Sequence, residues 1–80
     1  MKLYKPILSS RKDKKYMVLT KNGVIHFGAR TYQHYKDKLG FYSHLNHYDI
    51  NRRDNYYSRF GNKNIKNKES AMYWSHNILW

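Results

Sequence analysis

Residues 16–28 read YMVLTKNGVIHFG, and this stretch decides the fold. Asn22-Gly23 stands between two runs that are rich in β-branched and aromatic residues. This pattern is typical of a β-hairpin, because both central positions of a type I′ turn need positive φ. The type I′ register pairs Val18 with Phe27.

Alternation along the two predicted strands separates an apolar face from a mixed face. The apolar face is the better candidate for a core and carries Tyr16, Val18, Thr20, Ile25 and Phe27. A lone two-stranded hairpin is not stable in water, so helices are expected to cover this face.

Two helices are predicted in the second half of the chain. Asp49 is a favourable N-cap for a helix over residues 50–60, and Gly61 is suited to its C′ position. Asn67 is the expected cap of a last helix over residues 70–80, with Glu69 in its first turn.

A further short helix is indicated where Phe41, Leu45 and Tyr48 follow a spacing of four and then three residues. Residues 29–40 alternate poorly and are compatible with a loop, a short helix or a third strand. The expected core combines the hairpin with the helices: Val18, Ile25, Phe27, Tyr56, Phe60, Trp74 and Ile78.

The fold class is therefore α+β: an N-terminal β-hairpin packed against two or three short helices in a single small domain. A chain of 80 residues suffices for one domain. It has no cysteine to form a disulfide, and its aromatic content of 18% supplies the bulk of the core instead. Residues 1–15 read as a mobile basic arm, and residues 16–80 as a compact basic domain.

The formal net charge is +11, from 16 Lys and Arg against five Asp and Glu. Charge repulsion of this size destabilises the compact state, and a polyanion relieves it. Nucleic acid, anionic lipid and an acidic protein surface all remain candidates. The chain has neither a secretory signal nor an apolar run long enough to span a membrane, so we expect a protein that is not secreted.

Basic and aromatic residues alternate along several segments, a pattern that suits phosphate contacts and stacking on unpaired bases. The opposing interpretation is that the tyrosines form the core and the charges only solvate the outer surface. We expect nucleic-acid contacts from Lys12, Lys14, Lys15, Arg30, Arg52, Arg53, Arg59, Lys63, Lys66 and Lys68.

Catalysis and cofactor binding are not expected. Each carboxylate has a basic neighbour close in sequence and reads as a cap or charge partner, and no P-loop, GxSxG or HExxH motif is present. His44 and His47 have a helix-compatible ligand spacing, but zinc typically needs four donors and thiolates are absent. Ordinary histidines are the favoured interpretation, and metal binding at this pair is left open.

The order of motifs resembles a family of short basic proteins of unknown function encoded by large DNA viruses of algae and protists. The resemblance covers roughly residues 5–80 and lies in the strand Ile25-His26-Phe27-Gly28, the run from His47 to Arg59 and the aromatic end from Tyr73 to Trp80. The chain departs from the pattern at Phe60-Gly61, where a histidine is expected, and in ending at Trp80. The resemblance implies viral origin and brings no catalytic residues.

The leading hypothesis is a viral protein that binds nucleic acid through phosphates without sequence specificity, as in genome packing. The alternative is a minor structural protein of the virion that cements acidic capsid surfaces. Either role places the protein in the virion or in the viral factory of the host cytoplasm or nucleus. DNA, RNA and acidic protein are not distinguished as partners, and the oligomeric state stays open.

Overall fold

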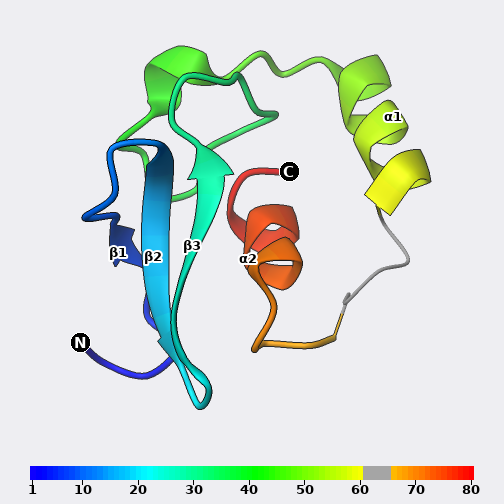
Figure 1. The fold of residues 1–80 in the computed structure, drawn as a ribbon. Helices are drawn as coiled ribbons and strands as arrows, with labels where there is room; N and C mark the ends of the chain where they lie inside the picture. The colour runs from blue at the N-terminus through cyan, green and yellow to red at the C-terminus, as the bar shows by residue number, and fades with distance from the viewer. Residues whose placement is uncertain (61–65) are drawn as a thin grey trace.

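A three-stranded antiparallel sheet in the order β1-β2-β3 forms one side of the molecule (Figure 1). The computed structural model describes residues 1–60 and 66–80. The strands are β1 (Ile7–Leu8), β2 (Lys14–Thr20) and β3 (Gly23–Ala29). A 3-10 helix, η1 (Ser43–Leu45), and two α-helices, α1 (Ile50–Phe60) and α2 (Ala71–Ile78), follow along the chain.

The predicted hairpin is present as β2 and β3, but its register differs from the type I′ prediction. Val18 pairs with Ile25 and not with Phe27, and the tight turn consists of Lys21 and Asn22. The Thr20 side chain explains this register, because its Oγ1 donates to the Gly23 carbonyl at 2.8 Å and accepts from the Asn22 backbone N–H at 3.2 Å.

The apolar face of the hairpin is buried as predicted. The pairing partner of each residue shifts by two positions, an even number, so each side chain keeps its face. The buried hydrophobic core consists of Tyr16, Val18, Phe27, Trp74 and Leu79. Ile25 and Ile78, which were also expected there, pack against this cluster and are partly buried.

The first fifteen residues are part of the fold and not a separate arm. Ile7 and Leu8 pair with β2 as a third strand, and Leu3 bridges to Leu19. The predicted boundary after residue 15 lies inside β2, which begins at Lys14. The reason is that Ile7 and Leu8 pair with the edge of the hairpin formed by β2. Periodicity within residues 1–15 does not indicate this pairing.

Helix α2 lies beside β3 and closes the core (Figure 1). Its N-cap is Ser70, whose side chain accepts from the Met72 backbone N–H at 3.2 Å. The prediction of Asn67 as the cap is wrong, because Asn67 instead accepts from the Glu69 backbone N–H one turn earlier.

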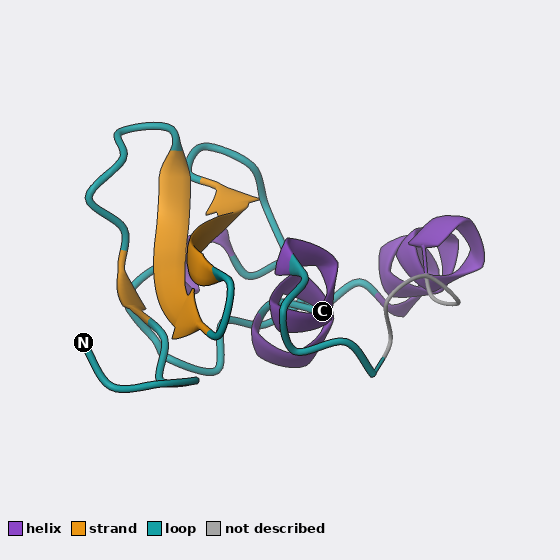
Figure 2. Cartoon of the chain, turned by 60° about the horizontal axis from the view of Figure 1, so that its bottom comes forward, coloured by secondary structure: helices purple, strands orange, loops and turns teal. Residues whose placement is uncertain are grey.

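Helix α1 has the predicted limits, and Asp49 caps it by accepting the backbone N–H groups of Asn51 and Arg52 at 2.9 and 3.2 Å. The helix stands away from the sheet, with α2 between them (Figure 2). Tyr56 and Phe60, expected in the core, are therefore only partly buried. The predicted C′ residue Gly61 lies outside the described residues.

The segment between β3 and α1 is mostly irregular. The predicted helix over Phe41, Leu45 and Tyr48 is wrong: only η1 forms there, and Phe41 and Tyr48 are exposed. The backbone leaves the helical region at Tyr48, which adopts φ 54°, and the Tyr42 backbone N–H donates to the Asp37 carboxylate. Within the described ranges, no helix is long and apolar enough to cross a membrane.

Candidate functional site

The carboxylates of the chain are largely used inside the fold. Three of the five accept backbone N–H groups: Asp37 from Leu39 and Tyr42, Asp49 from Asn51 and Arg52, and Glu69 from Lys21 and Asn22. Tyr4 also donates to Glu69, and this hydrogen bond is the main cause that lowers the pKa of the carboxyl. Arg11–Asp13 is the single ion pair among residues 1–60 and 66–80. The surface cations therefore stay largely uncompensated.

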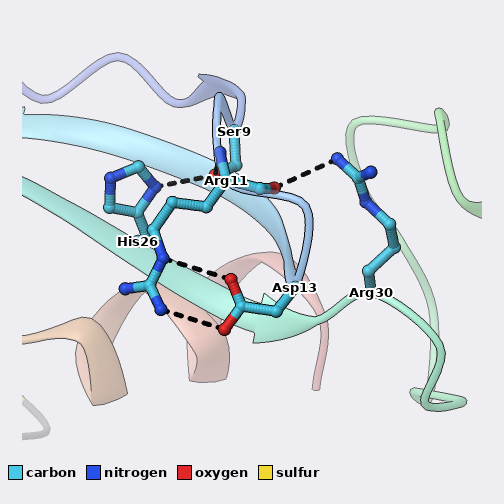
Figure 3. Close-up of polar contacts among 5 residues, drawn as sticks. All are labelled: Ser9, Arg11, Asp13, His26 and Arg30. Atoms are coloured by element: carbon cyan, nitrogen blue, oxygen red, sulfur yellow. Dashed lines mark hydrogen bonds and ion pairs between the residues drawn. The ribbon is translucent and has the colours of Figure 1, made fainter.

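Figure 3 shows the basic group at the turn between β1 and β2. Arg11 donates twice to Asp13, at 3.1 and 2.9 Å, and Arg30 donates to the Arg11 backbone carbonyl at 3.2 Å. Lys12 is exposed in the same turn, and Lys14 is partly buried at its end. The structure thus brings the predicted residues Lys12, Lys14 and Arg30 to one end of the sheet.

The three predicted arginines of α1 are exposed but differ in what they contact. Arg53 donates to the Trp80 backbone carbonyl at 2.8 Å, and its guanidinium lies 5.0 and 5.3 Å from the ring centroids of Tyr35 and Tyr57. Arg53 therefore fastens α1 to the end of the chain, a role the sequence did not indicate.

Arg52 and Arg59 are more available to a ligand. Arg52 donates to the Gln33 side chain at 2.8 Å. Within residues 1–60 and 66–80, the Arg59 guanidinium contacts the Phe60 ring, at 5.8 Å from its centroid, and forms no hydrogen bond. These contacts leave most of the five guanidinium N–H groups of each arginine open for phosphate.

The predicted lysine cluster after α1 is described only in part. Lys63 lies outside the described residues, whereas Lys66 and Lys68 are exposed. The Lys68 ammonium lies 5.6 Å from the centroid of the Tyr4 ring. These two lysines lie between α1 and α2, and no contact links them to the α1 arginines.

Lys15 is not on the surface, so its prediction as a surface phosphate contact is wrong. Its side chain is 1% exposed, and Nζ donates to the Tyr32 backbone carbonyl at 2.6 Å and to His34 Nδ1 at 2.9 Å. Because an ammonium only donates, His34 carries its own proton on Nε2 and donates it to Asn46 Oδ1 at 2.5 Å.

Burial shifts the pKa values of this buried polar group. It lowers the pKa of Lys15 to about 8, and burial together with the Lys15 charge lowers the pKa of His34. Next to them, burial and then the hydrogen bond to Asp37 raise the pKa of Tyr16. Lysine is rarely buried, so the sequence favours an exposed Lys15 and does not indicate its contact with His34.

A cleft of about 380 Å³ opens over Lys15, between the end of β3, α1 and the C-terminal residues. Its inner side is formed by the buried residues Lys15, His34 and Leu79. Four aromatic side chains also line it: Tyr32, Tyr56, Phe60 and Trp80. Tyr56 and Trp80 are stacked, with ring centroids 4.4 Å apart and planes 5° apart.

The cleft lies between the two groups of predicted basic residues. Arg59 lines it from α1, and Arg52 reaches it by binding Gln33, which also lines it. Arg30 is three residues from Gln33, which limits their Cα separation to about 11 Å. The loop after β3 therefore connects the basic turn to the cleft.

The two histidines with metal-ligand spacing do not point to a shared site. His44 is exposed, whereas His47 is partly buried. The His47 ring is tilted by 55° against the Trp80 ring, and its Nδ1 accepts the Asp49 backbone N–H at 2.8 Å. Among the residues that the structure describes, no group of three or more His, Asp or Glu side chains is arranged to hold a metal ion.

No protein-family model matches the chain, and no curated protein or solved structure is detectably similar to it. The resemblance to viral proteins therefore stays a prediction, and the function has to be argued from the geometry described above.

Proposed function

We propose that this protein binds nucleic acid without sequence specificity, through phosphate contacts of lysines and arginines that are exposed or partly buried at its surface. The observation that carries the proposal is the use of the carboxylates: the fold uses Asp37, Asp49 and Glu69 for backbone N–H groups and leaves the cations largely unneutralised. A surface of this kind attracts polyanions and releases their counterions on binding.

The contacts proposed are Lys12, Lys14 and Arg30 at one end of the sheet, Arg52 and Arg59 at the cleft, and Lys66 and Lys68 before α2. Arg53 contributes by fixing α1, and Lys15 is excluded as a surface contact. No element of the described fold corresponds to a module that reads base edges in a groove, which favours binding without sequence preference. The proposal involves no catalytic step.

Binding should be measured with a random 20-base-pair duplex, a single strand and an RNA hairpin as the salt concentration is raised. The logarithm of the association constant should fall linearly with log salt, with a slope of about −0.9 for each phosphate neutralised on B-DNA. An affinity that does not change with salt would remove the proposal.

The double variant Arg52→Gln, Arg59→Gln should weaken binding and reduce the slope by about 2 units. The matched control is Lys2→Gln, Lys5→Gln, which removes the same charge from two exposed residues at the N-terminus. If both variants weaken binding equally, net charge alone is responsible and the assignment of the α1 arginines is wrong.

A structural role in the virion is the second candidate, and exposed apolar side chains favour it. Phe41, Tyr48 and Ile50 are 65%, 57% and 61% exposed, as expected of anchors that fill pockets on a partner. A cement protein should remain with purified capsids at fixed stoichiometry after nuclease treatment, whereas a genome-binding protein should be lost with the nucleic acid. Both roles are consistent with location in the virion or viral factory.

A further inference from the structure

The cleft over Lys15 has the size and lining of a small-ligand site. Its volume of about 380 Å³ falls in the range of pockets that enclose small molecules, roughly 300–1,000 Å³. Tyr32, Tyr56, Phe60 and Trp80 provide flat apolar surfaces around it. Flat walls of this kind favour a planar aromatic ligand over an aliphatic one.

The inner side of the cleft also provides a built hydrogen-bond donor. The Lys15 ammonium has three N–H groups, of which the Tyr32 carbonyl and His34 Nδ1 take two. Among the described residues nothing accepts the third, although the side chain is 99% buried and lines the cleft. A buried donor without a partner is costly, and an acceptor atom on a ligand removes this cost.

The lining of the cleft adds groups that suit a nucleotide. Arg59 lies among the lining residues with its guanidinium largely open, and the exposed Asn55 has no side-chain hydrogen bond to another residue that the structure describes. The ligand should therefore be planar, carry an acceptor on its ring and be joined to an anionic group. Burial lowers the pKa of Lys15 to about 8, and the charge of the nearby Asp37 offsets this effect only in part.

We propose that the cleft takes one unstacked nucleobase of a single strand, with the base between the aromatic walls, a ring carbonyl on Lys15 Nζ and the neighbouring phosphate on Arg59. This inference rests on the proposed nucleic-acid binding and narrows it to strands with accessible bases. A paired base is held in the duplex stack, and its extrusion costs a few kcal/mol.

The experiment compares three probes of equal length at one salt concentration: oligothymidylate, the same strand with abasic positions throughout, and a duplex. The backbone charge of the two strands is the same, so their affinity ratio reports the base alone. We expect oligothymidylate to bind about 5- to 150-fold more tightly than the abasic strand, as stacking on aromatic side chains gives elsewhere.

Tyr32→Ala tests the cleft with little risk to the fold, since Tyr32 is 72% exposed. It should reduce the preference for oligothymidylate, whereas Phe41→Ala, which removes an exposed ring outside the cleft, should leave it unchanged. Lys15→Met should reduce the same preference, and its circular dichroism spectrum verifies that it folds.

The outcomes separate this inference from the proposed function. If the two strands bind equally and both respond to salt, the protein binds phosphates and the nucleobase site is wrong. If the preference exists but Tyr32→Ala and Phe41→Ala affect it equally, the base lies elsewhere. If no probe binds, both the nucleobase site and the proposed function are overturned.

Discussion

Replacing Gly28 with alanine tests the contact on which the inner side of the cleft depends. Gly28 has φ 76°, and a Cβ atom built there would lie 2.6 Å from Leu79 Cδ1 and 3.4 Å from Lys15 Cδ. Leu79 is 1% exposed and belongs to the core, so its methyl group can move away only by giving up core contacts. The variant should therefore suffer both backbone strain and overpacking.

The two costs can be separated with the other glycines. Left-handed backbone costs a residue with a Cβ about 1–2 kcal/mol, and overpacking a core adds about 1–3 kcal/mol. Gly40 also has a positive φ, of 89°, but a Cβ there would meet only Ser43 Oγ at an ordinary distance of 3.8 Å. Gly40→Ala should therefore show the first cost alone.

Urea unfolding followed by circular dichroism measures the difference. With a slope of about 1 kcal/mol per molar urea for a small domain, the midpoint of Gly28→Ala should lie about 1–3 M below that of Gly40→Ala. The slopes should stay equal. Equal midpoints would refute the reasoning, because they would mean that Leu79 does not pack tightly on β3.

Two other predictions concern Lys15 and Asp49. The folded-state pKa of Lys15 is about 8 against 10.5 ordinarily, so the unfolded chain binds more protons above pH 8. The free energy of unfolding should then rise between pH 8 and 10, by at most about 1.4 kcal/mol per pH unit, and Lys15→Met should lack this rise in thermal or urea titrations. An equal rise in both proteins would show that the general loss of positive charge causes it. Asp49→Ala should cost about 1 kcal/mol through the lost cap of α1, whereas Asp49→Asn should retain most of the stability, and urea midpoints of the two variants compare them directly.

Local signals explain which parts of the fold the sequence predicts. The limits of α1 are correct because Asp49 and its two backbone partners lie within three residues of one another. The prediction of the apolar face of the hairpin is correct, because a change of register by two residues leaves the alternation of the two faces unchanged. The register is not correct, because the Thr20 side chain bonds to the turn and Glu69, 48 residues away, also accepts the Lys21 backbone N–H at 2.7 Å.

Long-range contacts also explain why the roles of Lys15 and Arg53 in the site are not predicted from the sequence. Lys15 stands in a run of lysines that reads as a solvated arm, and only the fold brings Tyr32 and His34, 17 and 19 residues later, against its ammonium. Arg53 reads as a phosphate contact, but its guanidinium lies between two tyrosines and holds Trp80. In both cases the sequence correctly indicates a positively charged side chain, but it does not indicate which groups that side chain contacts.

The burial of Lys15 favours a ligand over a purely structural role. The chain has 16 basic residues, and all others in the described ranges keep some contact with water. Burying one ammonium beside a histidine costs free energy that a methionine of similar length would not, although the Tyr32 carbonyl and His34 would then lose a donor. These costs are of similar size, so the fold alone gains little from lysine at this position. A ligand acceptor on the third N–H is the contribution that only the lysine can make.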